Sequence, residues 1–297
     1  MITRWEVVEH IVDAADGRRL AVADGGDPDG VPVLVHYGTP NSRLQYGPDV
    51  ATATEHGMRM ITYDRPGYGG STAQPGRTIA HCAGDVRAIC SALGIDRLLT
   101  WGISGGGPHV LACAALLPDL IPAAAALASP APWGADGLDY FAGMGEMNAD
   151  DTRLYFQDHA AARAKLERDR VDVLGASAEE LSQIFRTLLS KADAAVFTSR
   201  LAQYFVESAA EGLGPGGEGW WEDGVSWLEP WGFGFADIKM PVLLLQGEQD
   251  RFVPFGHGVW LAAHIPGVEA RLTKDDGHLT LTTRHLGEVY DWLLEHW

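Results

Sequence analysis

The architecture of this chain can be predicted outward from one segment, Leu98-Leu-Thr-Trp-Gly-Ile-Ser-Gly-Gly-Gly107. Residues 98–101 form a short apolar run of the kind that suits a strand buried on both faces. Residues 104–117 follow with a helical pattern that is stopped by Pro118. Ser104 is therefore predicted to lie on a tight turn between strand and helix, where its neighbours must be small because the turn packs closely against adjacent chain.

This turn gives Ser104 the surroundings of a nucleophile. It would raise the hydroxyl above the edge of the sheet and direct the following backbone N–H groups at one point, where the helix dipole favours negative charge. The pentapeptide G-x-S-x-G also occurs by chance, and a plain glycine-rich turn is the alternative reading. Its position directly after a strand and directly before a helix favours the nucleophile.

The rest of the chain alternates between strand and helix patterns. Two antiparallel strands are expected at 5–13 and 19–23, joined by a turn at Asp16-Gly17. Buried strands are then expected at 31–36, 58–63, 98–101, 123–128 and 242–246, with a weaker strand pattern at 268–272. Helices are expected at 78–93, 104–117, 254–264 and between His278 and His296. This alternation predicts an α/β fold with a mostly parallel eight-stranded sheet flanked by helices.

One segment interrupts the alternation. Residues 134–236 contain several helical stretches and no strand pattern. Ser177-Ala-Glu-Glu180 resembles a capping box that opens a helix running to about Lys191, and another helix is expected at 193–211. We expect this segment to be a helical cap over one end of the sheet, inserted into a core made of residues 1–133 and 237–297.

Composition excludes several classes of partner. The chain has 297 residues, with 22 basic and 40 acidic side chains and a formal net charge of −18. Such a surface repels phosphate backbones and anionic lipid, so neither nucleic acid nor a membrane is expected as a partner. The N-terminus lacks the apolar core of a signal peptide, and the three widely spaced cysteines suit free thiols, so we expect a cytoplasmic protein. No clustered set of ligand residues indicates a metal.

Two loops downstream of Ser104 carry the residue types that complete a catalytic triad. Asp250 follows the predicted strand 242–246, and His278 follows the next strand, so both are expected at the carboxyl edge of the parallel sheet. The alternative acids are Glu248, Asp275 and Asp276. The alternative histidines of this region, on or at the end of helices, are His257, His264, His285 and His296.

Four motifs together resemble the α/β-hydrolase superfamily over nearly the whole chain. Besides the serine turn, residues 63–71 are similar to its D-x-P-G-x-G-x-S loop, residues 247–254 to its G-x-x-D-x-x-x-P acid loop, and Gly277-His278 to its closing motif. Each motif is weak alone, but four in this order and spacing are specific. The resemblance, which extends to bacterial esterases and proline iminopeptidase-like members, implies Ser104 as nucleophile, His278 as base, Asp250 as orienting acid and no cofactor.

The loop after the third predicted strand departs from the superfamily pattern. That loop usually reads H-G-x-P or H-G-G, whereas here it reads His36-Tyr-Gly-Thr-Pro40. Matching the glycine and the proline places the backbone N–H of Thr39, together with that of Gly105, in the oxyanion hole. Tyr37 then replaces the usual histidine, and the H-G-G-P-G of proline iminopeptidases is absent. His36 is expected to support this loop by hydrogen bonding rather than to act on substrate.

Further residues are candidates for substrate binding. They lie in or beside the predicted loops, on the helix after Ser104 or in the insertion: Tyr37, Gly38, Ile103, His109 and Trp231. His109 and the tryptophans of the insertion have packing as their alternative role, and Arg65 is expected to be structural.

The resemblance implies acyl transfer to water on a small-molecule substrate. A carboxylic ester or a lactone comes first, an amide or peptide bond and a carbon–carbon bond come next, and a perhydrolase side activity would use the same triad. Relatives that carry an aspartate at the turn, the haloalkane dehalogenases and epoxide hydrolases, are excluded by Ser104. A non-catalytic ligand receptor of the same fold is the alternative from another class. The aromatic content of the insertion favours an apolar acyl group of small to medium size, and the sequence leaves the oligomeric state open.

Overall fold

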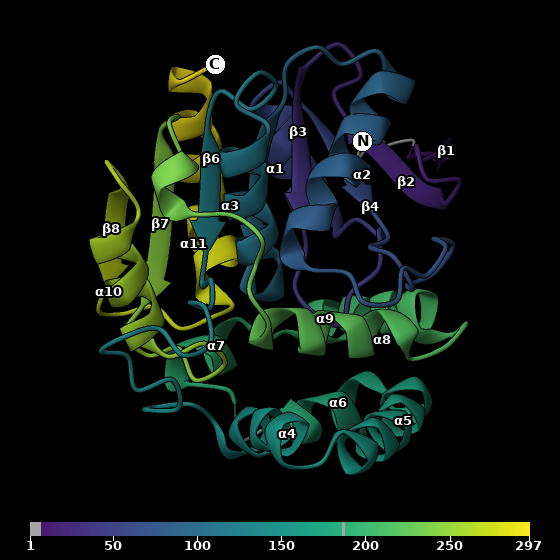
Figure 1. Ribbon diagram of the computed structural model, residues 1–297, viewed down its shortest axis with the longest axis vertical. Helices are drawn as coiled ribbons and strands as arrows, with labels where there is room; N and C mark the ends of the chain where they lie inside the picture. The colour runs from purple at the N-terminus through teal and green to yellow at the C-terminus, as the bar shows by residue number, and fades with distance from the viewer. Residues whose placement is uncertain (1–6, 186–187) are drawn as a thin grey trace.

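A single eight-stranded sheet organises the computed structural model, which describes residues 7–185 and 188–297 (Figure 1). The strand order is β1-β2-β4-β3-β5-β6-β7-β8. β1 and β2 are antiparallel to their neighbours, and the pairs from β4 through β8 are parallel. The strands are β1 (Val8–Asp13), β2 (Arg19–Gly26), β3 (Val31–His36), β4 (Met58–Tyr63), β5 (Leu99–Ile103), β6 (Ala124–Leu127), β7 (Val242–Gly247) and β8 (Glu269–Thr273).

The burial of the strands follows from their sequences. β6 and β7 are apolar throughout or nearly so, and every residue of both is buried, as expected for strands covered on two faces. The edge strands β1 and β8 are mostly exposed. The predicted α/β fold with a mostly parallel eight-stranded sheet is confirmed. The predicted first strand began at Trp5, and its first two residues lie outside the described residues.

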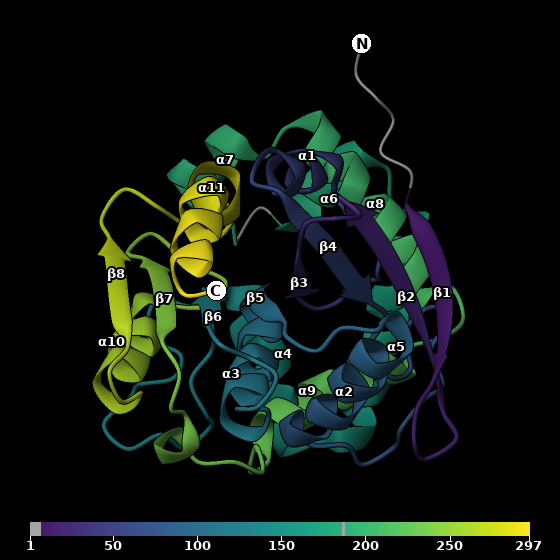
Figure 2. The same ribbon diagram turned by 90° about the horizontal axis from the view of Figure 1, so that it is seen from above.

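Helices cover both faces of the sheet (Figure 2). α1 (Gly47–Glu55) and α11 (Thr280–Glu295) lie on one face. α2 (Cys82–Leu93), α3 (Gly107–Leu116) and α10 (Phe255–His264) lie on the other. Each face therefore has its own apolar core, and the sheet separates the two. Short 3₁₀ turns stand at η1 (Ile79–His81), η2 (Ser104–Gly106) and η4 (Phe235–Asp237).

The segment between β6 and β7 forms a layer of helices beyond the carboxyl ends of the parallel strands (Figure 1). Its helices are α4 (Glu146–Gln157), α5 (His159–Gly175), α6 (Ala178–Ile184), α7 (Lys191–Val196), α8 (Ser199–Leu213) and α9 (Glu218–Leu228). We call these six helices the cap. Parallel α/β sheets build their sites at this edge, so the cap lies where a ligand is expected to bind.

Two helix predictions in the cap need correction. The capping box that starts α6 is present, since the Ser177 hydroxyl accepts the Glu180 N–H and the Glu180 carboxylate accepts the Ser177 N–H, but α6 ends at Ile184 and does not reach Lys191. The single helix expected at 193–211 is two helices. Thr198 accepts the N–H of Leu201 as the N-cap of α8, and the chain is extended there.

The helix α1 was not predicted. Its N-cap, Tyr46, makes no side-chain capping bond, and the helix opens with Gly47 and Pro48. Pro48 and the acidic Asp49 are favourable in the first turn of a helix, but these two signals are weak without a capping side chain. Packing of Val50 and Ala53 into the core beneath the sheet stabilises α1 instead.

Candidate active site

Ser104 lies in a strained turn at the carboxyl end of β5. Its φ is +57°, a left-handed conformation that costs a non-glycine residue roughly 1–3 kcal/mol. The glycines on either side allow this turn, because a Cβ at Gly102 would lie 2.7 Å from the carbonyl oxygen of His36, and one at Gly106 would overlap with the same carbonyl. The serine is therefore held between β5 and the start of the helix, as the sequence predicts.

Asp250 is held by four hydrogen bonds in the loop after β7. One carboxylate oxygen accepts the backbone N–H groups of Phe252 at 2.8 Å and Val253 at 2.9 Å. The other accepts the Gln246 amide at 3.2 Å and pairs with Nδ1 of His278 at 2.8 Å. The carboxylate is buried and has no freedom to turn away, so it fixes the orientation of the imidazole.

The surroundings of His278 favour its protonated form. Burial lowers the pKa of this imidazole, but the charge and hydrogen bond of Asp250 and the charge of Asp193 outweigh burial, so the pKa lies above its ordinary value of 6.5. The ring of Phe252 stacks on the imidazole, with centroids 4.6 Å apart and planes at 20°. The imidazole is thus held between an aromatic ring and a carboxylate.

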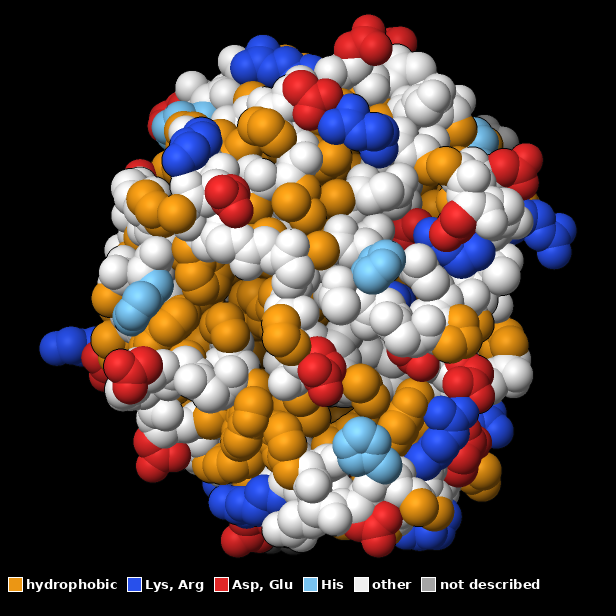
Figure 3. Space-filling view, in the orientation of Figure 1, with side chains coloured by type: hydrophobic (Ala, Val, Ile, Leu, Met, Phe, Trp, Pro, Cys, Tyr) orange, Lys and Arg blue, Asp and Glu red, His pale blue; other side chains and the backbone are white. Residues whose placement is uncertain are grey.

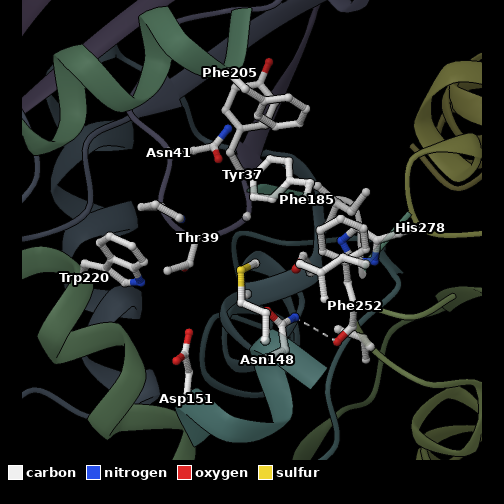
Figure 4. A pocket seen from close by; sticks show the side chains of 18 of the residues that line it. Tyr37, Thr39, Asn41, Asn148, Asp151, Phe185, Phe205, Trp220, Phe252 and His278 are labelled. Atoms are coloured by element: carbon white, nitrogen blue, oxygen red, sulfur yellow. Dashed lines mark hydrogen bonds between the residues drawn. The ribbon is translucent and has the colours of Figure 1, made fainter. Parts of the chain in front are cut away.

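Ser104 and His278 line one cavity of about 370 Å³ between the sheet and the cap. This volume is in the range of small-molecule sites. Most of the wall is apolar, and it includes Phe185 and Phe252 close to His278, with Phe205 farther from it (Figure 4). The structure brings these predicted site residues to the same cavity: Tyr37, Gly38, Thr39, Ile103 and Gly105.

A charged region lies at the far side of the cavity. Lys165 forms ion pairs with Asp151 at 2.7 Å and Asp169 at 2.5 Å, and all three side chains line the wall. Asp151 and Trp220 lie away from His278 in Figure 4. Asp49 is a further acid of the wall, and burial raises its pKa to about 7. The wall beside His278 is therefore apolar, and Asp151 with its partner Lys165 lies on another side of the cavity.

The apolar wall continues to the surface of the molecule. Figure 3 shows hydrophobic side chains gathered on the side where the core meets the cap. Trp133 and Phe156 are two large exposed apolar side chains, and their rings stack with centroids 4.0 Å apart. Trp133 also contacts Tyr140, which lines the cavity. An apolar surface thus adjoins the cavity.

Two predicted substrate-binding residues lie elsewhere. His109 is buried in α3, and its Nδ1 is 2.9 Å from the carbonyl oxygen of Gly105; burial lowers its pKa to about 3, so the ring is neutral. Trp231 is buried in the core among apolar side chains. Neither residue lines the cavity, whereas Trp220 and Trp227 do. A tryptophan-rich stretch shows that aromatic packing is present but not which rings face a ligand.

Arg65 holds the loop that the sequence assigns to the oxyanion hole. Its guanidinium donates to the carbonyl oxygens of Tyr37 at 2.6 Å and Gly38 at 2.9 Å, and to the Thr39 hydroxyl at 2.7 Å. His36, expected to support this loop, has its Nδ1 3.4 Å from the Tyr63 hydroxyl instead. His36 therefore does not hold this loop as expected. Arg65 holds it instead, because its planar guanidinium reaches three acceptors, which one imidazole cannot do.

Asp223 of α9 connects this loop to the cap. Its buried carboxylate pairs with Arg65 at 2.6 Å and Arg77 at 2.5 Å, and accepts the hydroxyls of Thr39 at 2.6 Å and Tyr68 at 2.9 Å. Burial acts against the charge, but the two guanidinium groups hold the pKa of Asp223 well below its usual range. Asp223 lies 158 residues from Arg65 in the sequence, and no local pattern joins them.

The two candidate oxyanion donors are close neighbours. A Cβ at Gly105 would lie 2.7 Å from the Thr39 hydroxyl, and a Cβ at Gly38 would lie 3.3 Å from Cβ of Ser104. Gly105 follows the nucleophile at the start of the helical segment, where backbone N–H groups lack partners within the helix. The arrangement can stabilise a negative oxygen beside Ser104.

Neither a membrane span nor a metal cluster is found in the described residues. No helix among residues 7–185 and 188–297 is both long and apolar enough to cross a membrane. In the same part of the chain, no three His, Cys, Asp or Glu side chains are grouped as metal ligands would be.

Comparison with known proteins gives the family. Residues 31–284 match the family described as the alpha/beta hydrolase fold. A non-heme chloroperoxidase from Streptomyces lividans is 36% identical over 101 residues, which are 33% of this chain and 36% of that protein. A bifunctional esterase/perhydrolase from Acinetobacter calcoaceticus is 31% identical over 122 residues, which are 41% of this chain and 44% of that protein. A thermophilic esterase from Thermogutta terrifontis superposes with a TM-score of 0.69 at 21% identity, over 98% of this chain and 99% of that chain.

The chain belongs to the α/β-hydrolase fold family, and the family and fold expected from the sequence are confirmed. The match covers most of the 297 residues. Both curated relatives are matched over less than half of their own length. The likeness to the thermophilic esterase concerns the fold alone. The family defines a class of hydrolases, and the reaction must be argued from the site.

Proposed function

We propose that this protein is a serine hydrolase that cleaves a carboxylic ester or a lactone through an acyl-enzyme on Ser104. One observation carries the proposal: a serine in a left-handed turn and a histidine paired at 2.8 Å with a buried aspartate line the same cavity. A structural role for these groups would require neither the strained serine nor the buried acid.

The geometry supports one catalytic step for each group. Because Nδ1 of His278 pairs with Asp250, Nε2 is the nitrogen that takes the proton of Ser104 as its oxygen attacks the acyl carbon. Asp250 stabilises the imidazolium that forms. The same histidine then gives the proton to the leaving oxygen, and later activates the water that releases the acyl group from the serine.

The backbone N–H groups of Gly105 and Thr39 are the proposed oxyanion donors. Both residues line the cavity beside Ser104, and Arg65 together with Asp223 fixes the loop that carries Thr39. Preorganised donors of this kind contribute strongly because they need no reorganisation when negative charge develops on the substrate oxygen.

The cavity supports a substrate with an apolar acyl group of small to medium size. Aromatic and aliphatic side chains surround the triad, and an apolar surface adjoins the cavity at Tyr140.

We propose residues 134–236 as the cap domain, because the chain between β6 and β7 supplies α4 to α9 and much of this wall. The buried, free cysteines agree with the expected cytoplasmic location.

The first experiment is labelling with a fluorophosphonate probe, located by mass spectrometry, beside a series of p-nitrophenyl esters of increasing acyl length. We expect stoichiometric labelling on Ser104, turnover of short and medium esters, and loss of both in Ser104→Ala. A circular dichroism spectrum of the variant controls for folding.

Other outcomes select the other candidates. Turnover of amides or of carbon–carbon bonds in preference to esters and lactones would replace the proposed substrate while keeping the triad. Ligand binding with neither labelling nor turnover, in well-folded protein, would contradict the enzyme and favour a receptor of the same fold.

A further inference from the structure

A second buried aspartate faces the triad from the cap. Asp193 lies in the first turn of α7 and is fully buried. Ser190, the N-cap of that helix, accepts the Asp193 N–H at 3.1 Å and donates its hydroxyl to the Asp193 carboxylate at 2.8 Å. The cap helix therefore holds the carboxylate in one orientation. Asp193 does not line the cavity, so it does not contact substrate there.

The Asp193 carboxylate accepts hydrogen bonds from the backbone of the catalytic histidine. Oδ2 accepts the N–H of His278 at 3.1 Å, and Oδ1 accepts the N–H of Leu279 at 2.7 Å. Oδ1 also lies 3.4 Å from the N–H of Thr280, the first residue of α11. A carboxylate from another segment thus caps α11, where negative charge is favourable.

The same contact requires a glycine at the position before His278. A Cβ at Gly277 would overlap with the Asp193 carboxylate and would come within 2.5 Å of the Ser190 hydroxyl. The Gly277-His278 pair, which resembles a family motif in sequence, therefore has a physical cause in this chain. Only a residue without a side chain allows the cap to approach the loop so closely.

We propose that Asp193 is a positioning residue for His278. Through Asp193, the cap fixes the loop that carries His278 and stabilises the imidazolium. The inference rests on the proposed function, because it concerns the same triad. Two charged groups among the described residues act on this imidazole: Asp250, from the loop after β7, and Asp193, from α7. Asp250 contacts the ring, whereas Asp193 acts through the backbone and through its charge.

The variant Asp193→Asn separates these effects from simple packing. The amide has nearly the shape of the carboxylate, but either orientation places its NH₂ group against a backbone N–H of His278 or Leu279. It also removes one negative charge near the imidazole. Since an imidazolium is stabilised by that charge, its removal must lower the pKa of His278.

The test compares Asp193→Asn with Asp150→Asn and the unmodified protein. Asp150 is an exposed residue of α4, so its replacement changes the net charge equally without contact to the triad. For Asp193→Asn we expect the acid dissociation constant of His278 to rise about tenfold and the plateau kcat to fall about tenfold, with KM changed less than about twofold. For Asp150→Asn we expect all three to stay at the level of the unmodified protein.

The pKa of His278 is measured in two ways. The first is the pH profile of kcat/KM for a p-nitrophenyl ester, with active enzyme counted by the fluorophosphonate probe. The second is an NMR titration of ¹⁵N-labelled histidine, assigned with His278→Gln, which needs no turnover. An Asp193→Asn protein with the His278 titration of the unmodified protein would overturn the proposal, even if it were less stable. Failure of the proposed hydrolase would appear separately, as an inactive unmodified protein whose His278 still titrates.

Discussion

At the level of single residues, the proposed mechanism requires a neutral His278 before Ser104 can attack. Only the neutral imidazole accepts the serine proton, and the pKa of His278 lies above 6.5 because Asp250 and Asp193 outweigh burial. We therefore expect kcat/KM to fall about tenfold per pH unit on the acid side and to level off above a midpoint higher than pH 6.5. A pH profile with a neutral ester measures this midpoint.

Replacement of the orienting acid tests the pair of His278 and Asp250. Asp250→Asn leaves an amide beside Nδ1 and favours the wrong imidazole tautomer, so we expect kcat to fall by about a thousandfold or more. Glu248→Gln is the control, since Glu248 is the exposed alternative acid of the same loop. Full activity of Asp250→Asn with loss in Glu248→Gln would assign the acid to Glu248 instead.

The space beside Gly105 permits a further prediction. A Cβ there would lie 2.7 Å from the Thr39 hydroxyl and would overlap with the Trp227 ring. We expect Gly105→Ala to displace the loop of residues 36–40, which carries the proposed oxyanion donor Thr39 and which we call the oxyanion loop, and to lower kcat/KM by about a hundredfold or more. Gly84→Ala on α2, where a Cβ would meet nothing within 4 Å, controls for the substitution and should keep full activity. A normal rate for Gly105→Ala would count against an oxyanion hole at this place.

The sequence predicts where single residues lie in the fold when their motifs are local. Ser104, Asp250 and His278 each belong to a short motif whose backbone geometry demands particular neighbours. His109 and Trp231 were predicted to bind substrate, but they are packed in the core, because helical or aromatic patterning does not distinguish a buried side chain from one that faces a cavity.

At the level of elements, α9 supports the oxyanion loop through Asp223 and Arg65. Arg65→Lys keeps the positive charge but loses the fork that reaches Tyr37, Gly38 and Thr39. We expect kcat to fall about tenfold or more with a smaller change in KM, and stability to fall by about 2 kcal/mol. Initial rates and thermal unfolding measure the two effects.

Arg77→Lys is the matched control for this prediction. Arg77 pairs with the same Asp223 carboxylate, but its other hydrogen bond goes to the Gly219 carbonyl rather than to the oxyanion loop. We expect a similar loss of stability with kcat changed less than about twofold. Equal losses of kcat in both variants would show that the charge cluster matters only for the fold.

Helices and strands with a short local sequence signal can be predicted, whereas those stabilised by distant contacts cannot. The buried strands and the capping box of α6 follow from short patterns, whereas α1 has a weak local signal and is stabilised by packing. The contacts of Asp193 and Asp223 join residues 85 and 158 positions apart. Their sequence surroundings resemble any polar helix, and only the folded chain shows that both reach the triad and its oxyanion loop.

At the level of the whole molecule, the net charge of the protein and the charges in the cavity wall both disfavour anionic substrates. The chain carries a formal net charge of −18. Besides Asp49, whose pKa burial raises to about 7, three aspartates and one lysine line the cavity: Asp151, Asp169, Asp172 and Lys165. An anionic substrate therefore meets a repulsive field at the surface and again inside, while the apolar wall near Ser104 offers it no compensating contact.

This repulsive field predicts how salt changes the preference for a neutral over an anionic ester. We compare p-nitrophenyl hexanoate with the mono-p-nitrophenyl ester of adipic acid, which have acyl chains of equal length but differ by one terminal carboxylate. At low salt we expect kcat/KM for the anionic ester to be at least about tenfold lower. Raising the ionic strength from about 0.01 M to about 0.3 M shortens the screening length from about 30 Å to about 6 Å, so the anionic ester should gain about fivefold while the neutral one stays constant. Equal rates for both esters at low salt would contradict the apolar, neutral substrate that the cavity supports, and a gain by both would point to an effect of salt on the protein itself.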